Sequence, residues 1–250
     1  MKIEHLSVSH INDFIERRPK WYLSRVLGYD FPMGAAAHRG TAVEHGVTHG
    51  LLNNCSLDES VELALKDFDN LSPGCEKDDT TSTRVAIPAM VAELIEVLHP
   101  YGKPESVQRR VEGKLRETGE IPWIGYLDLE FPEVIVDIKT KNKTPSSIPG
   151  GWRRQGAFYS MCSNKPVKFV CAVATKTVKV QTLEMTAEDS NSGMKELSSA
   201  ARAILALTEL PDETLAHVCF PDSSDWTLSD KSIRAAAAKV WPHIQQQGEV

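Results

Sequence analysis

The chain has 250 residues, of which 41% are hydrophobic and 25% are charged, a composition typical of globular proteins rather than of disordered or fibrous ones. No apolar run approaches the ~20 residues that a membrane-spanning helix needs, and the N-terminus lacks a signal-peptide core. We therefore expect a cytoplasmic protein without a membrane partner. The five cysteines are scattered and odd in number, which argues against a disulfide framework and against a zinc ribbon.

The formal net charge of −6 is unevenly distributed along the chain. Residues 101–180 contain fourteen Lys and Arg against eight Asp and Glu, a balance of +6 that leaves −12 for the rest. A basic middle with acidic flanks suits a channel that attracts phosphates on an otherwise anionic body. A solvated basic face is the more common source of such a pattern, so the charge alone is weak support for a nucleic-acid partner.

The first hundred residues are predicted to be mainly helical, because apolar residues recur there with the spacing of amphipathic helices. Ser7 or Ser9 can cap the first helix, and Ser56 can cap a later one. The polar stretch 72–83 is predicted to be a loop. The helices are expected at residues 7–15, 21–27, 34–52, 58–68 and 84–98.

From residue 107 onward the apolar residues follow the period of two that strands show. Strands are expected at 107–115, 123–131 and 134–140, and on either side of a turn at Thr175–Lys176. Further helices are expected at 151–162, from Thr186 to Leu210, and at 232–241. This order predicts an α/β fold in which a central mixed sheet of about five strands is flanked by helices.

Two carboxylates are predicted to face each other in the middle of the chain. A tight turn at Pro132–Glu133 should pair the flanking strands so that Asp128 lies directly opposite Asp137. Like charges so placed, with Cβ atoms ~5 Å apart, are unfavourable unless a cation or an altered pKa compensates. Lys139 follows Asp137 by two residues and should project from the same face. Glu130 lies on the same face of its strand as Asp128 and is the rival ligand if the hairpin register differs.

Two carboxylates and a lysine on one face suit the hydrolysis of phosphodiester bonds. Carboxylate oxygens can hold Mg²⁺ with several waters, and the metal lowers the pKa of a bound water. The lysine can orient or deprotonate that water and stabilise the transition state. The alternative is a surface hairpin with an Asp137–Lys139 ion pair and a solvated Asp128. The apolar run 134–136 favours the functional interpretation, because an Asp at the end of a buried strand needs a partner.

Four segments carry a family resemblance. Residues 125–140 match a G-x-[IL]-D hairpin that ends in D-x-K-T, and residues 155–159 match Q-x3-Y. Gly40 with Glu44 matches a G-x3-[HE] helix motif, and residues 7–23 match an S-x-S…P-x-W-Y-L start. In their order along the chain, the four motifs resemble those of the RecB-like and phage-type exonucleases of the PD-(D/E)XK nuclease superfamily. The similarity extends from about residue 7 to residue 160.

The resemblance implies a role for each matching residue. The metal ligands would be Glu44, Asp128, Asp137 and the carbonyl of Ile138; Lys139 would be the catalytic lysine; and Gln155 and Tyr159 would position DNA or the lysine. Charge and position add Lys141, Lys143, Arg153 and Arg154 as candidate phosphate contacts. Bacterial relatives often have His at the position of Glu44, and the adjacent His45 leaves either residue possible. Glu44 is preferred, because phage-type exonucleases use a glutamate there.

The resemblance also implies a restriction-endonuclease-like core within one nuclease domain, with a helical part at 1–100, a catalytic core at 101–185 and a helical part at 186–250. The expected activity is a Mg²⁺-dependent deoxyribonuclease, with Mn²⁺ able to substitute. It would digest DNA from its ends during recombination, repair or phage DNA processing, in a bacterial or phage-infected cytosol. A single-strand annealing protein or another recombination factor is a candidate partner.

Some relatives carry an iron–sulfur cluster on cysteines near the C-terminus. Only Cys219 lies there in this chain, so no cluster is expected. A structure-specific endonuclease or resolvase on the same fold is the enzyme alternative. A catalytically inactive DNA-binding module is the alternative from another class. Digestion polarity, strand preference and oligomeric state are left open by the sequence.

Overall fold

The computed structural model describes residues 3–75, 77–222, 225, 228, 230–242 and 244. The strands are β1 (Leu6–Ser7), β2 (Ser106–Gly113), β3 (Trp123–Glu130), β4 (Ile135–Lys141), β5 (Val167–Ala174) and β6 (Val178–Glu184). The α-helices are α1 (Val8–Glu16), α2 (Arg18–Trp21), α3 (Ala35–Asn53), α4 (Leu57–Leu71), α5 (Lys77–Arg84), α6 (Ile87–Leu98), α7 (Gly150–Ser163), α8 (Ala187–Thr208), α9 (Asp212–Val218) and α10 (Lys231–Val240). Short η segments lie at Tyr22–Val26, His99–Tyr101 and Arg116–Thr118.

The strands form one mixed sheet in the order β1-β3-β4-β5-β6, with β2 also paired to β3. The pairs β3–β4 and β5–β6 are antiparallel, whereas β1–β3 and β4–β5 are parallel. The prediction of an α/β fold with a central mixed sheet flanked by helices is confirmed, and it is consistent with a restriction-endonuclease-like core. The sheet has six strands instead of about five. The additional β1 has two residues, too few to show a period-two pattern.

The chain divides into two compact units. One comprises Met1–Phe31, Glu112–Ile124 and Met194–Val250, and the other comprises Pro32–Val111 and Gly125–Gly193. The second unit contains all the residues predicted to form the metal site. Whether the whole chain acts as one nuclease domain stays a prediction. None of the described helices is both long and apolar enough to cross a membrane.

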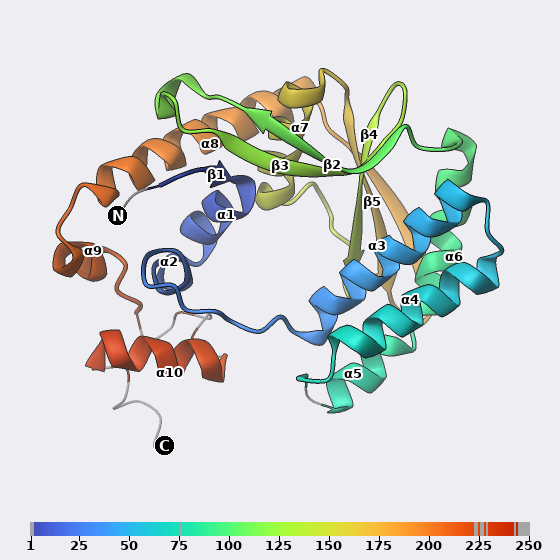
Figure 1. Cartoon of the computed structure of the whole chain (residues 1–250), viewed down its shortest axis with the longest axis horizontal. Helices are drawn as coiled ribbons and strands as arrows, with labels where there is room; N and C mark the ends of the chain where they lie inside the picture. The colour runs from blue at the N-terminus through green and yellow to red at the C-terminus, as the bar shows by residue number, and fades with distance from the viewer. Residues whose placement is uncertain are drawn as a thin grey trace. The chain divides into compact units, whose positions relative to one another are not determined.

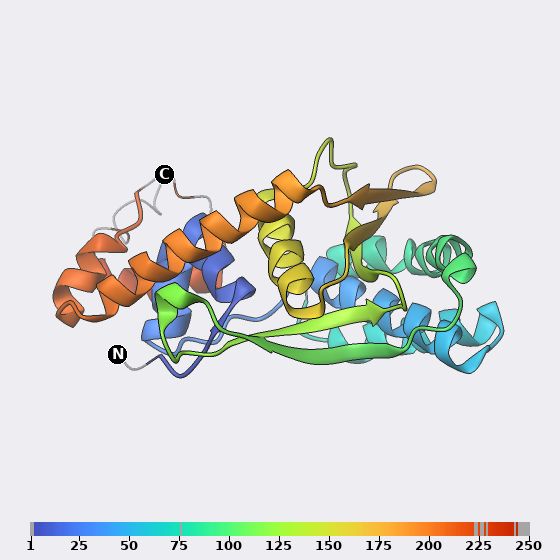
Figure 2. The same ribbon diagram turned by 90° about the horizontal axis from the view of Figure 1, so that it is seen from above.

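In the second unit, helices cover both faces of β4 and β5. Helices α3, α4 and α6 pack together on one side, and α7 lies on the other, as both views show (Figure 1 and Figure 2). Alternation along β4 directs Val136 and Ile138 into the apolar core that is shared with α3 and α6. The intervening Asp137 therefore faces the side of α7. The sheet geometry thus separates the apolar core from the polar residues of β4.

Local sequence signals account for the way that α3 and α4 pack. Ser56 caps α4 in a capping box with Glu59, as expected for its N-terminus. A Cβ atom at Gly46 would lie 2.6 Å from the backbone oxygen of Ser60, so only glycine permits this close approach of α3 to α4. The two helices can then form a tight layer over the sheet.

Two expectations about helices are corrected by the structure. The predicted loop 72–83 is wrong in part, because α5 occupies Lys77–Arg84. Both oxygens of Asp69, on α4, accept hydrogen bonds of 2.7 Å from Arg84, a long-range contact that a polar stretch does not reveal. In the first unit, the helical segment expected from Trp21 begins earlier, at Arg18. Ser7 caps α1 as predicted, accepting a hydrogen bond from the backbone N–H of His10.

Candidate active site

The hairpin of β3 and β4 sets the geometry of the candidate site. Leu129 pairs with Val136, which is the register predicted from the tight turn. This register sets Asp128 opposite Asp137, and the prediction is confirmed. Oδ2 of Asp128 accepts a hydrogen bond of 3.0 Å from the backbone N–H of Ile138. Asp128 is 9% exposed and Asp137 has no exposed surface, so both carboxylates are buried.

A chain of polar contacts connects β4 to α7. The ammonium of Lys139 pairs with Oδ2 of Asp137, and its Nζ donates a hydrogen bond of 3.0 Å to Oε1 of Gln155. Nε2 of Gln155 donates in turn to the hydroxyl of Tyr159, at 2.9 Å. Gln155 and Tyr159 are four residues apart and so share one face of the helix. Four residues from two of the matched motifs, Asp137, Lys139, Gln155 and Tyr159, are therefore joined in one network.

Helix α3 supplies a third carboxylate. Glu44 lies close enough to Asp137 and Lys139 for both charges to shift the pKa of its carboxyl group. His45 is turned toward α4, where its Nδ1 contacts a carboxylate oxygen of Asp67. The structure thus places Glu44, and not His45, beside the hairpin carboxylates. Glu44, Asp128 and Asp137 are called the acidic cluster below.

Gln108, on β2, was missed by sequence analysis and belongs to this site. Its Nε2 donates hydrogen bonds to Oε1 of Glu44 and, at 3.2 Å, to Oδ1 of Asp128. The backbone of Gln108 is left-handed, with a φ of 45°, which is uncommon for a non-glycine residue and strained within a strand. No sequence pattern in 106–113 signals this conformation. The amide bridges two members of the acidic cluster.

Burial raises the pKa value of each member of the acidic cluster, and repulsion from neighbouring carboxylates raises those of Glu44 and Asp128 further. Burial raises the pKa of Asp128 well above its usual range, and the charges of Asp137 and Glu44 raise it further. Burial also raises the pKa values of Glu44 and Asp137. Such shifts mean that the ionised cluster is held at a cost in free energy, which a cation would reduce.

Lys139 is held in its protonated form. Burial lowers the pKa of Lys139, but Asp137, Asp128 and the other acidic neighbours outweigh burial and leave the pKa above its ordinary value. An ammonium with this pKa donates hydrogen bonds and does not accept a proton at neutral pH. In this protonated form, Lys139 can orient neighbouring groups and stabilise negative charge; its role in the reaction stays a prediction.

The donor set of the acidic cluster fits a hard divalent cation. Oδ2 of Asp137 is paired with the Lys139 ammonium, whereas Oδ1 is buried without a hydrogen-bond donor among the residues that the structure describes. Unshared carboxylate oxygens beside further carboxylates are the ligands that Mg²⁺ prefers. Within the described ranges, no group of three or more His, Cys, Asp or Glu side chains is arranged so that it could hold a metal ion. The amide of Gln108 and the ammonium of Lys139 make contacts with the cluster that a cation would replace.

Glu130, the rival ligand, is occupied elsewhere. Its carboxylate accepts hydrogen bonds from Arg109 at 2.5 and 3.0 Å and from Ser106 at 2.8 Å, and it forms an ion pair of 3.1 Å with Lys165. Burial raises the pKa of Glu130, but these hydrogen bonds outweigh burial and lower the pKa to about 2. Glu130 is therefore part of a separate ion-pair group and does not join the acidic cluster.

The candidate phosphate contacts differ in accessibility. Lys141 and Lys143 are exposed, and Nζ of Lys141 lies 5.4 Å from the centroid of the Trp152 ring. Arg153 is half-buried, whereas Arg154 is only 4% exposed. Of these four residues, Arg154 is the least accessible to a phosphate. The carbonyl of Ile138 as a ligand stays a prediction.

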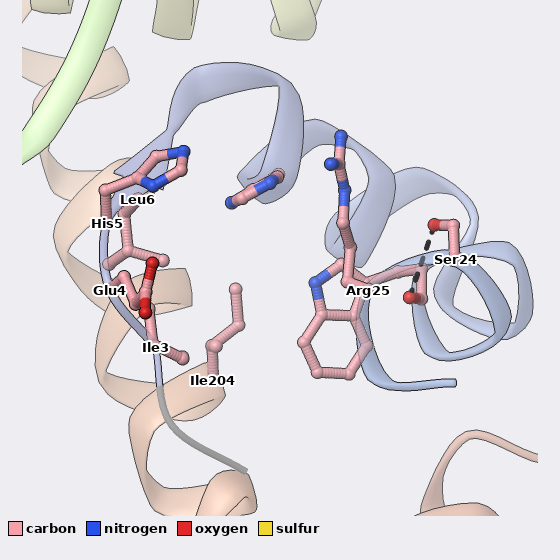
Figure 3. A pocket seen from close by; sticks show the side chains of 9 residues that line it. Ile3, Glu4, His5, Leu6, Ser24, Arg25 and Ile204 are labelled. Carbon is pink, nitrogen blue, oxygen red and sulfur yellow. Dashed lines mark hydrogen bonds between the residues drawn. The ribbon is translucent and has the colours of Figure 1, made fainter. Parts of the chain in front are cut away.

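A separate pocket of about 340 Å³ lies in the first unit (Figure 3). His5, His10, Arg25 and Ile204 are among the residues that line it. Burial, together with nearby Arg25 and His5, lowers the pKa of His10 to about 4, so this histidine is neutral at physiological pH. No residue predicted for the active site lines this pocket.

Comparison with known proteins supports a nuclease-like fold. No protein-family model and no curated protein sequence matches the chain. Among solved structures, the chain is similar to a candidate exonuclease from Eubacterium rectale, with a TM-score of 0.59 and 17% identity over 81% of this chain and 80% of that one. SSO0001 matches 82% of this chain and 92% of its own, at 13% identity and a TM-score of 0.35, which is too low to carry an argument. The first similarity shows a shared fold.

Proposed function

We propose that this protein is a divalent-metal-dependent DNA nuclease of the PD-(D/E)XK superfamily that removes nucleotides from DNA ends. The observation that carries the proposal is the buried acidic cluster, whose member Asp137 pairs with a protonated Lys139 that is also hydrogen-bonded to Gln155. Buried like charges beside a lysine are destabilising for the fold alone. Their arrangement suits a site that meets a cation and an anionic substrate.

Each side chain of the site has a defined task in the proposed hydrolysis. Glu44, Asp128 and Asp137 would hold the metal through carboxylate oxygens. When bound, Mg²⁺ would offset charge on the phosphate and activate water. Lys139 would donate hydrogen bonds from Nζ to a phosphate oxygen as negative charge grows there. Gln155, oriented by Tyr159, would fix the position of that ammonium.

The substrate and mode of cleavage rest on three kinds of support. The excess of basic residues in 101–180 suits a polyanion. The order of the four motifs resembles RecB-like and phage-type exonucleases. The structural neighbour from E. rectale is a candidate exonuclease. Recombination, repair or phage DNA processing, with a single-strand annealing protein as partner, is the setting that this resemblance favours.

The proposal is tested with purified protein, Mg²⁺ or Mn²⁺, and end-labelled linear duplex DNA beside a covalently closed circle. Wild-type protein should shorten the linear DNA and leave the circle intact, and chelation of the metal should stop the reaction. Lys139→Ala should slow cleavage by ~10²-fold or more while metal and DNA still bind. Lys168→Ala is the matched control, because Lys168 pairs with Glu184 at 2.8 Å on the same sheet and should leave the rate unchanged.

The outcomes separate the competing functions. Nicking of the closed circle by wild type, but not by Lys139→Ala, would support an endonuclease instead. DNA binding without metal-dependent cleavage of either substrate would favour the inactive binding module. Equal loss of cleavage in both lysine variants would remove the special role assigned to Lys139.

A further inference from the structure

Arg39, on α3 five residues before Glu44, is a buried cation that the proposed chemistry has not used. Only 3% of its surface is exposed. Nη1 donates a hydrogen bond of 2.8 Å to Oδ1 of Asn142, whereas Nε is buried without an acceptor among the described residues. Asp79 influences Arg39 electrostatically, but no carboxylate in the described part of the chain forms an ion pair with it.

Such an arginine is unfavourable for folding alone. Burial lowers the pKa of Arg39 from its ordinary value, yet a guanidinium stays charged at any physiological pH. A buried charge whose donors are incompletely used destabilises the fold relative to a paired one. Asn142 offers only a neutral acceptor. The remaining donors of Arg39 therefore suit an anion that is supplied from outside the chain.

The surroundings indicate where that anion would bind. Arg39 and Asn142 line a pocket of about 430 Å³. Its other charged lining residues are Glu44, Lys139 and Lys141, so three cations stand against one carboxylate. Because Glu44 and Lys139 belong to the candidate active site, the pocket opens beside the acidic cluster.

A second pocket is also lined by Arg39 and Asn142 but suits an anion less well. It has a volume of about 460 Å³ and is lined by Arg39, Asn142, Asp79 and Lys176 among others. Asp79 and Lys176 offset each other there, which leaves Arg39 as the net charge. The electrostatic preference is therefore for the pocket that contains Lys139 and Lys141.

We propose that Arg39, positioned by Asn142, binds a backbone phosphate of the DNA next to the bond that is cleaved. The inference rests on the proposed nuclease function and adds a substrate-binding subsite to it. The planar guanidinium can present two parallel N–H donors to phosphate oxygens, which gives orientation as well as attraction. Asn142 acts on the substrate only through Arg39, because its amide holds Nη1 and so sets the plane of the guanidinium.

A substitution to methionine separates binding from folding. Arg39→Met keeps most of the volume and removes the charge and all donors. Asn142 is exposed, so water can replace its lost partner. The melting temperature of the free protein should therefore hold or rise, since replacing a buried charge with an apolar side chain is often neutral or stabilising. A structural role for Arg39 would instead lower it.

DNA affinity is measured by fluorescence anisotropy with a labelled duplex in Ca²⁺, over a series of salt concentrations. Arg39→Met should weaken binding about 10-fold or more, as expected when hydrogen bonds to a charged group are lost. The slope of log K against log salt should shrink by about 0.9, the value for one phosphate contact on duplex DNA. Arg84→Met is the matched control, because Arg84 pairs with Asp69 outside this pocket and should change neither quantity.

Arg39→Lys provides a second variant that keeps the buried charge if the methionine variant fails to fold. Arg39→Lys should keep the salt slope, because the positive charge remains. It should weaken binding less than Arg39→Met does, because the ammonium retains the charge and loses only the two parallel donors of the guanidinium. If both Arg39 variants keep the wild-type DNA affinity, the wild-type salt slope and cleavage, the phosphate subsite is wrong and the proposed nuclease function is not affected. If wild-type protein neither binds nor cleaves DNA, the proposed function is wrong and the subsite falls with it.

Discussion

Asp128→Asn is expected to stabilise the protein without metal and to destabilise it relative to wild type with metal. The asparagine keeps an acceptor for the backbone N–H of Ile138 and removes a charge that opposes Asp137 and Glu44. It gives up the 3.2 Å hydrogen bond from Gln108, whose amide still donates to Glu44. Relief of this repulsion in a buried site should add on the order of 1 kcal/mol. For a chain of this size that corresponds to a rise of about 2–4 °C in melting temperature.

Bound metal should reverse the order of stability. At a Mn²⁺ concentration of about 100 times Kd, binding adds ~2.7 kcal/mol to the wild-type protein, a rise of about 5–10 °C. Asp128→Asn lacks one ligand of the acidic cluster and should gain little. The wild type would then melt above the variant, although it melts below the variant in chelator.

The pH dependence of the metal-free proteins has a defined sign. The folded-state pKa of Asp128 is raised above the ordinary value of 3.8. The stability that its protonated form contributes is therefore fully present below the unfolded-state pKa and is lost as pH rises through the folded-state pKa. The advantage of Asp128→Asn in chelator should accordingly grow as pH rises from acidic toward neutral.

Calorimetric melting of chelator-treated protein, with and without Mn²⁺, tests this reasoning. Asp69→Asn serves as the control carboxylate, because Asp69 pairs with Arg84 on the surface and its effect should not depend on metal. The reasoning is refuted if Asp128→Asn melts below wild type in chelator and shows the same shift with Mn²⁺. That result would mean that the carboxylate has a structural partner and no metal.

Three further outcomes are expected. Gln108→Leu should lower the metal-free melting temperature by several degrees, since Glu44 and Asp128 lose hydrogen bonds of ~1.5–3 kcal/mol. Mn²⁺ should reduce the difference in melting temperature between this variant and wild type. The same difference in saturating Mn²⁺ as in chelator would contradict this prediction. Glu130→Gln should lower stability at neutral pH by about 2 kcal/mol, because Arg109 loses its charged acceptor. With a folded pKa of about 2 against 4.5 unfolded, this difference should vanish in urea titrations as pH falls from 4.5 toward 2. Purified protein should be colourless, and stoichiometric iron with labile sulfide would refute the absence of a cluster.

The sequence by itself determined the features that depend on short-range geometry. The Pro132–Glu133 turn and the period of two set Asp128 against Asp137 and place Lys139 on the same face, because antiparallel register follows from the turn. The helical period likewise places Gln155 and Tyr159 on one face of α7. These residues could be related to each other without knowledge of the rest of the fold.

The tertiary structure decided which distant groups meet the hairpin. The rotation of α3 that turns Glu44 to the acidic cluster and His45 to Asp67 is fixed by its packing on α4 and the sheet. Gln108 reaches the cluster through a left-handed residue inside β2, and the Arg39 guanidinium is buried where α3 passes Asn142. Burial and long-range contact depend on all the elements together, so no local pattern along the chain encodes them.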